Sequence, residues 1–168
     1  DKVLCVKGDV PITDRVSMNQ LQQTLAESIE MPIKGFNARC HWEILVDDNN
    51  CAIQCNLDAI NGALLNLVNN SLQACNEPAE ITIRLERKDQ QLLISVLDNG
   101  SGIEPAIEPQ LMTMFFTTKD QGTGIGLSVV RIVTQSHGGH FSLSNRADVG
   151  TFALSFIHSL RCRRSFAY

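Results

Sequence analysis

The sequence predicts an α+β fold, a two-layer α/β sandwich in which helices cover one face of a mixed, mostly antiparallel sheet. Strand-like alternation interleaves with helical periodicity, and short polar turns join two pairs of strand segments, which indicates hairpins. The 168 residues, 43% hydrophobic and 19% charged, suit one domain with a sizeable core. We therefore expect one layered domain rather than a doubly wound parallel sheet.

The first half of the chain alternates short strands with one helix. Apolar residues recur at helical spacing over 19–35, which predicts an amphipathic helix ending near Gly35. The strands expected here lie at 16–18, 41–46 and 51–55. The last two flank the polar run 47–50, which is a turn signal.

The second half begins with the longest helical pattern. Asn56 or Asp58 caps it, an apolar stripe follows it to about Cys75, and Pro78 ends it. A hairpin comes next, with its polar turn at 87–90. The remaining expected elements are the strands 81–86, 92–97, 139–144 and 151–157, the loop 99–124 and the helix 125–137.

Composition and charge exclude several classes of protein. No apolar run approaches the roughly 20 residues that span a bilayer, so we expect no contact with a membrane. A formal net charge of −4 and a pI near 5.5 argue against a nucleic-acid binder. The six cysteines have no Cys-x-x-Cys spacing, and we interpret them as reduced packing residues of a cytoplasmic protein, not metal ligands.

Three clusters of residues suggest chemistry, and the first lies on the long helix. Asn66 and Asn70 are four residues apart, so they share one helix face, with Asn69 beside them. Asparagine is a poor helix former, so three within five residues are costly unless they serve a function. Amide oxygens are hard, uncharged ligands that suit Mg²⁺. The alternative is that these side chains are merely solvated or bond nearby backbone.

The second cluster, Asp98-Asn99-Gly100-Ser101-Gly102-Ile103, directly follows a predicted strand. Its carboxylate can accept a hydrogen bond from an exocyclic amine. Its glycines allow positive φ and a close approach of backbone to a flat ligand. Because Asp-Asn-Gly is also a common turn, a plain loop is the alternative interpretation.

The third cluster, Gly122-Thr123-Gly124-Ile125-Gly126-Leu127, opens the last predicted helix. Free N–H groups and the positive end of the helix dipole make such a loop an anion site. It is not the dinucleotide fingerprint, because no strand leads into it and its spacing is Gly-x-Gly-x-Gly. It is not a Walker loop, because Gly-Lys-Ser/Thr is absent.

In this order the clusters resemble the catalytic, ATP-binding domain of bacterial sensor histidine kinases, within the superfamily of gyrase, Hsp90 and MutL. The matching segments are 66–70 (the N box), 98–102 (first glycine box), 115–119 (F box) and 122–127 (second glycine box). The likeness spans about 12–158. It looks closest to the nitrogen-regulation branch and, within it, to flagellar-regulatory sensor kinases. The resemblance implies a Bergerat-type ATP-binding fold.

The resemblance implies an adenine pocket around the second cluster. Asp98 would accept a hydrogen bond from the adenine amino group, and Thr151 would bond adenine through water. Gly100 and Gly102 would shape the pocket beside Ile103.

The resemblance also implies phosphate and metal contacts at the other clusters. Asn70, with Asn66, would hold the Mg²⁺ that bridges the phosphates. Lys119, on an ATP lid at 115–123, would reach the terminal phosphates and complete the catalytic set. The residues expected along the phosphate chain are Gly122, Thr123, Gly124, Ile125, Gly126 and Leu127. ATP and Mg²⁺ are therefore the expected ligands.

One departure from the wider superfamily bears on the reaction. The ATP-hydrolysing members carry Glu at the position of Asn66, and an amide cannot act as a general base. The implied function is to present the γ-phosphate of Mg-ATP to a histidine on a separate helical domain, which passes it to a response regulator aspartate. Two alternatives stay open: a catalytically silent nucleotide-binding regulatory module, and a gyrase-like ATPase clamp.

The acceptor histidine is expected outside this chain. Structural or surface roles are expected for its own histidines, which are His41, His137, His140 and His158. The resemblance places the tail of an upstream dimerisation domain at 1–10, the catalytic domain at 11–158 and a C-terminal tail at 159–168. We expect this chain to be monomeric and unable to phosphorylate itself. Phe115 and Phe116 are expected to form an apolar hinge that docks the helical domain, with a core patch as the alternative.

Overall fold

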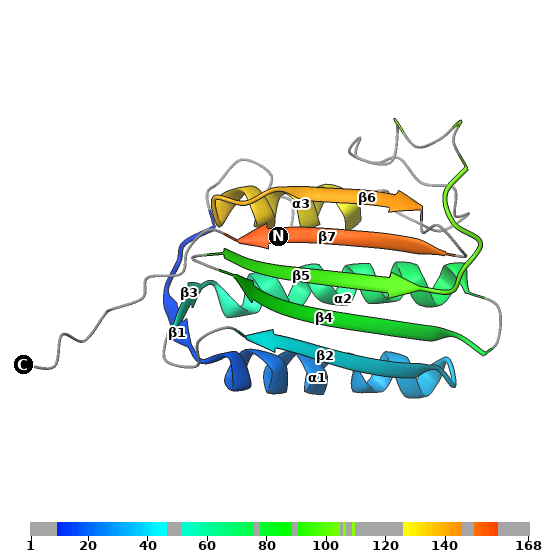
Figure 1. Cartoon of the computed structure of the whole chain (residues 1–168), viewed down its shortest axis with the longest axis horizontal. Helices are drawn as coiled ribbons and strands as arrows, with labels where there is room; N and C mark the ends of the chain where they lie inside the picture. The colour runs from blue at the N-terminus through cyan, green and yellow to red at the C-terminus, as the bar shows by residue number, and fades with distance from the viewer. Residues whose placement is uncertain are drawn as a thin grey trace, which may run out of the picture.

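A five-stranded sheet with three helices on one face forms the body of the molecule (Figure 1). The computed structural model describes residues 10–46, 52–75, 78–88, 91–104, 106, 109, 126–145 and 150–157, without the side chains of 46, 88 and 151–157. The strands are β1 (Asp14–Val16), β2 (Arg39–Val46), β3 (Ile53–Cys55), β4 (Glu80–Lys88), β5 (Gln91–Asp98), β6 (Phe141–Asn145) and β7 (Thr151–Ile157). The helices are α1 (Met18–Gly35), α2 (Leu57–Ala74) and α3 (Gly126–Ser136).

The sheet is mixed, as the sequence predicted. Its strand order is β2-β4-β5-β7-β6, in which β2 and β4 are parallel and the other neighbours antiparallel. A separate antiparallel pair joins β1 to β3. The parallel pair follows from the chain path, because α2 lies between β2 and β4 in the sequence and crosses over the sheet.

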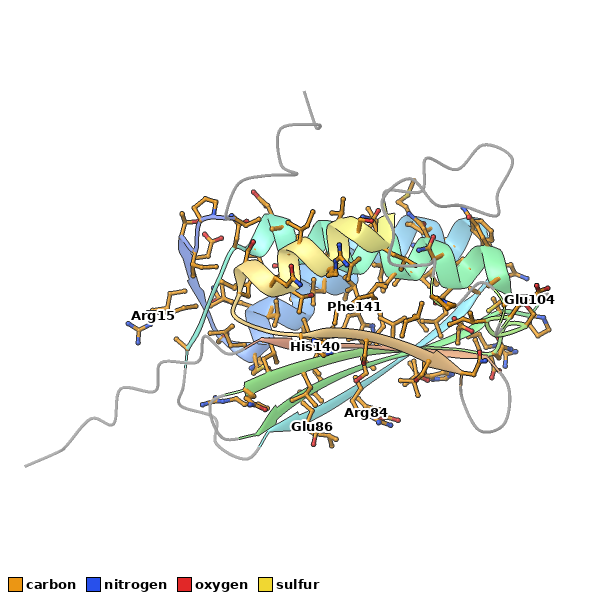
Figure 2. The ribbon with its side chains drawn as sticks, turned by 90° about the horizontal axis from the view of Figure 1, so that it is seen from above. Arg15, Arg84, Glu86, Glu104, His140 and Phe141 are labelled. Atoms are coloured by element: carbon orange, nitrogen blue, oxygen red, sulfur yellow. The ribbon has the colours of Figure 1, made fainter. Side chains whose placement is uncertain are left out.

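Apolar and polar side chains alternate along β4, which explains why the helices cover only one face of the sheet. Ile81, Ile83 and Leu85 are fully buried, whereas Arg84 and Glu86 point away from the helices in Figure 2. On that open face the Arg84 guanidinium donates to the Glu43 carboxylate of β2 at 2.6 Å. Side chains on a strand point to opposite faces in turn, so this pattern fixes the register of β4 in the sheet.

The core is built where α2 lies over the central strands. The largest fully buried side chains are Leu21, Leu25, Ile53, Leu72, Ile81, Ile83, Leu85, Leu92, Val68, Val96 and Val130. Burying a side chain of this size contributes roughly 1.5–3 kcal/mol to folding. The apolar stripe of α2 is thus held against the sheet, which leaves its other faces free for polar residues.

Two local predictions were wrong. Met18 belongs to α1 and not to a strand at 16–18, because Ser17 forms a capping box with Gln20 and begins the helix there. Arg87 and Lys88 belong to β4 and not to a turn, because they pair with Leu92 and Gln91 of β5. Predictions for the tails 1–9 and 158–168, and for the stretch 110–125, lie outside the described residues.

Three cysteines lie in the described part of the chain, and all are free thiols: Cys40, Cys55 and Cys75. Burial raises the pKa of Cys40 and of Cys55 to about 11, so neither is a thiolate near neutral pH. Among the described residues no group of three His, Cys, Asp or Glu side chains is placed to hold a metal ion. These three cysteines therefore act as packing residues.

Candidate nucleotide-binding site

The asparagine pair of α2 faces the start of α3. Asn56 caps α2, its Oδ1 accepting from the Ala59 N–H at 3.0 Å, and the helix then buries its apolar stripe on the sheet. Asn66 and Asn70 are half-buried on another face. A Cβ on Gly126, the first residue of α3, would lie 3.9 Å from Asn66 Cγ and 3.9 Å from Asn70 Nδ2. The first and third sequence clusters therefore meet, and the glycine leaves room for about one atom between them.

Asp98 is the last residue of β5, where it is buried with 2% of its surface exposed. Its Oδ1 accepts a hydrogen bond from the Gly100 N–H at 2.9 Å. An aspartate that bonds the N–H two residues on forms an Asx turn, which fixes the orientation of its carboxylate. The carboxylate is thus a positioned hydrogen-bond acceptor at the end of a central strand.

The glycines of the second cluster are needed for two different reasons. Gly102 has φ +80°, a conformation that only glycine adopts without strain. Gly100 is required by crowding, because a Cβ there would lie 2.8 Å from the Ala74 carbonyl oxygen. The expected freedom of φ is confirmed at Gly102. At Gly100 the close neighbour is the chain's own Ala74 carbonyl, so the expected approach of backbone to a flat ligand stays a prediction.

The Asp98 loop also rests on the end of α2. The Ser101 N–H donates to the Ala74 carbonyl at 3.3 Å, one helical turn beyond Asn70. Burial raises the pKa of the neighbouring Cys75 thiol, and the charge of Asp98 adds to the effect. The C-terminal half of α2 therefore joins the asparagine pair to the Asp98 loop.

Gly150 brings the start of β7 against Asp98. It has φ +95°, and a Cβ there would collide with the Asp98 carbonyl oxygen. Thr151 follows directly and pairs with Asn145 of β6. The backbone thus places Thr151 beside the end of β5, in the region where the sequence expected it. In Figure 1 the ends of β5 and β6 and the start of β7 lie together at one edge of the sheet.

Several expected site residues cannot be located. Lys119, Gly122, Thr123, Gly124 and Ile125 lie outside the described residues, as do Phe115 and Phe116. Their roles stay predictions. Leu127 is half-buried on the first turn of α3, next to Gly126.

Two asparagine side chains that the sequence did not single out for this role hold the Asp98 loop. Asn99 Oδ1 accepts from the Glu80 N–H at 2.9 Å, and its Nδ2 donates to the Pro78 carbonyl at 3.1 Å. Asn145 makes a similar pair of bonds with Ile103. Only a weak feature of the sequence points to Asn145. Asparagine is uncommon in strands, so an asparagine at the end of β6 suggests a local hydrogen-bonding role.

His137 lies away from this site, at the other end of α2. It is buried, its Nδ1 donates to the Val133 carbonyl at 2.7 Å, and its Nε2 accepts from the Asn56 N–H at 2.9 Å. Burial lowers the pKa of His137, which keeps the ring neutral as the second bond requires. Its role is to join α3 to the start of α2.

Comparison with known proteins identifies the family. The sequence profile of the family described as histidine kinase-, DNA gyrase B-, and HSP90-like ATPase matches residues 55–161. The chain belongs to this family. Its fold is that of histidine kinase catalytic domains: the catalytic domain of the histidine kinase ThkA superposes with a TM-score of 0.75 at 28% identity, covering 87% of this chain and 95% of that one.

The sequence relatives are sensor kinases. The Sensor protein kinase FleS of Pseudomonas aeruginosa is 37% identical over 153 residues, which is 91% of this chain and 37% of FleS. ThkA in complex with the response regulator protein TrrA matches at 26% identity and a TM-score of 0.71, over 87% of this chain and 41% of that one. The chain thus spans about a third of the length of the curated relatives it matches. Within the described part, no helix is long and apolar enough to cross a membrane.

Proposed function

We propose that this chain is the ATP-binding catalytic domain of a two-component sensor histidine kinase. It binds Mg-ATP and presents the γ-phosphate to a histidine on a separate helical domain, which passes the phosphoryl group to a response regulator. The observation that carries the proposal is the meeting of Gly126 at the start of α3 with Asn66 and Asn70. The kinases FleS and ThkA, and the complex of ThkA with TrrA, support it.

In this proposal the Asp98 pocket holds the base. A buried carboxylate oriented by the Gly100 N–H accepts a hydrogen bond from the 6-amino group of adenine. Gly100 and Gly102 shape the pocket by letting the loop pack closely on Ala74 and Asn145, with Ile103 and Thr151 at the rim. The same acceptor disfavours guanine, whose 6-oxo group is also an acceptor.

The phosphates lie between α2 and α3 in this proposal. The residues fit Mg²⁺, because Asn66 and Asn70 offer neutral amide oxygens beside the space that Gly126 leaves. With no acidic cluster among the described residues, phosphate oxygens and water complete the ligand set. Mg²⁺ supplies charge neutralisation when bound. The N–H groups at the start of α3 bind the phosphate chain.

The asparagine at position 66 favours transfer over hydrolysis. An amide cannot take a proton from water, so the domain holds ATP without activating a competing nucleophile. In the transfer, an imidazole nitrogen forms the new bond to the γ-phosphorus while the bond to the bridging oxygen breaks and ADP leaves. We place the domain in the cytoplasm, where ATP is present. The flagellar assignment stays a prediction.

Calorimetric titration of Mg-ATP into the chain tests the base pocket. Asp98→Asn replaces an acceptor that faces the amino group with a side chain of equal size, and we expect an affinity loss of about 100-fold or more. Asp14→Asn is the matched control, because Asp14 accepts from the Leu57 N–H at 2.8 Å, at the far end of α2. Equal affinities in the parent and in Asp98→Asn would refute the base pocket.

Two further measurements separate the alternatives. Steady-state ATP turnover should be negligible, and substantial turnover would favour a gyrase-like clamp. Phosphoryl transfer to the histidine-bearing helical domain of a sensor histidine kinase, supplied in trans, should give an acid-labile phosphohistidine. Tight ATP binding without transfer to any such domain would favour a silent regulatory module.

A further inference from the structure

We propose that Asn145 is a positioning residue of the nucleotide pocket, whose side-chain amide clamps the exit of the Asp98 loop. This inference rests on the proposed function, because the loop matters as part of an adenine pocket. Asn145 belongs to none of the sequence clusters. It lies at the end of β6, 42 residues from its partner Ile103.

The clamp consists of two hydrogen bonds to one residue. Asn145 Oδ1 accepts from the Ile103 N–H at 2.6 Å, and Asn145 Nδ2 donates to the Ile103 carbonyl at 3.0 Å. One side-chain amide thus satisfies both backbone groups of Ile103, as a neighbouring strand would. Because Asn145 is exposed, either bond alone would compete with water, whereas two parallel bonds fix both distance and orientation.

Gly102 supplies a second observation that points to the same contact. A Cβ at this position would lie 2.8 Å from Asn145 Oδ1, closer than a carbon atom tolerates. The glycine of the first glycine box therefore leaves the space that the Asn145 amide occupies. The positive φ of Gly102 directs the chain onto that amide.

The clamp links the loop to the strand that carries Thr151. Asn145 pairs with Thr151 between β6 and β7, and Gly150 packs against the Asp98 backbone. A displaced Ile103 would therefore shift the loop exit relative to both Asp98 and Thr151. In Figure 2, Glu104, the residue after Ile103, lies at this end of the molecule, opposite Arg15.

Asn99 shows that the loop is held at both ends. Its amide clamps the loop entry to Glu80 and Pro78 by the same donor and acceptor pair that Asn145 uses at the exit. The three residues between Asn99 and Ile103 are therefore tied at both ends. Asn99 fixes where the loop leaves β5, and Asn145 fixes where Ile103 stands at the pocket rim.

The test compares Asn145→Ala and Asn145→Asp with Ser144→Ala, a control at the adjacent exposed residue of β6. For the alanine variant we expect the Ile103 amide hydrogen to exchange about tenfold faster by NMR. We also expect Mg-ATP affinity to fall about tenfold, with a smaller preference for ATP over GTP. The aspartate variant keeps an acceptor for the Ile103 N–H but no donor for its carbonyl, so its affinity should be intermediate. Ser144→Ala should match the parent.

Two results would overturn the role of Asn145. One is unchanged Ile103 exchange in Asn145→Ala. The other is faster exchange with unchanged ATP affinity and unchanged preference over GTP, which would leave Asn145 a purely structural residue. A parent chain that binds no ATP would instead refute the proposed function, and this outcome is distinguishable because it precedes any comparison of variants.

Discussion

The N-termini of α2 and α3 have similar backbone groups and opposite surroundings. At α2 the protein supplies its own acceptors: Asp14 Oδ2 accepts from the Leu57 N–H at 2.8 Å, and His137 Nε2 accepts from the Asn56 N–H at 2.9 Å. The first turn of α3 carries no acidic side chain, and Gly126 faces neutral asparagine amides there.

This difference assigns separate roles to the two helix ends: the start of α2 contributes to stability, and the start of α3 to the proposed binding of nucleotide. The start of a helix attracts negative charge, and α2 satisfies that attraction internally with a carboxylate. The first turn of α3 carries no carboxylate, and we expect the phosphates of the proposed ligand to supply the negative charge there. Changes at the first end should therefore alter stability, and changes at the second should alter nucleotide affinity.

Of the changes that compare these two helix ends, Asn70→Ala should give the largest loss of nucleotide affinity. We expect Mg-ATP affinity to fall about 10- to 100-fold, because the amide is one of the two side-chain ligands proposed for Mg²⁺. Asn69→Ala is the control, since it removes the same side chain from the adjacent position of the same helix. Calorimetry that finds equal losses in both variants would attribute the effect to the helix and not to the site.

His137→Ala should give the largest loss of stability and leave binding unchanged. The Asn56 N–H loses its acceptor and a buried ring leaves a cavity, so unfolding free energy should fall by about 2–3 kcal/mol in urea denaturation. Mg-ATP affinity should stay within twofold of the parent. His140→Ala, at an exposed position, is the control. A parallel loss of affinity would mean that the two ends of α2 are coupled.

Acidification should weaken the same contact in the parent chain. Burial lowers the pKa of His137 in the folded state, so below about pH 6.5 the unfolded chain takes up the proton first. The contribution of His137 is therefore complete at neutral pH and is lost as pH falls toward its folded pKa, by at most about 1.4 kcal/mol per pH unit. Denaturation between pH 7.5 and 5.5 measures the slope. His137→Gln should flatten it, and an unchanged slope would assign the dependence to other groups.

Gly126→Ala should give the smallest effect on stability, and of opposite sign. The added methyl group makes ordinary contacts at 3.9 Å, so the helix gains about 0.5–1 kcal/mol. The same methyl group fills the space beside the asparagine pair, and Mg-ATP affinity should fall. Gly62→Ala in α2 is the matched control, because nothing lies within 4 Å of its Cβ position. Equal affinities in both variants would show that phosphate does not use this space.

The fold was largely predictable from sequence because its periodicities are strong. The helices and strands occur in the predicted order, and β7 has the predicted bounds 151–157. The two wrong predictions have local causes. The capping box at Ser17 begins α1 one residue earlier than expected. Pairing with β5 extends β4 through Arg87, which lies in the polar run that suggested a turn. A long-range pairing overrides a local polar signal there.

Site residues could be predicted only where the residue types and spacing of a single motif indicate a chemical role. Asn66, Asn70 and Asp98 could be singled out because their residue types and spacing are unusual for a helix or a strand end. Asn145 could not, because its partner Ile103 is 42 positions away and only the folded chain brings the two together. Outside the site, a structural or surface role was expected for His137, but its contact with Asn56, 81 positions away, was hidden for the same reason.

The clamp between Ile103 and Asn145 also isolates the chain between them. The entropy of closing a flexible loop grows only with the logarithm of its length, about 0.6 kcal/mol for each doubling. Because the Asn145 amide holds Ile103 in place, residues inserted after Glu104 would lengthen the segment between Ile103 and Asn145 without displacing Asp98. Insertions into the segment that follows Glu104 should therefore cost little stability and leave the geometry of the Asp98 loop unchanged.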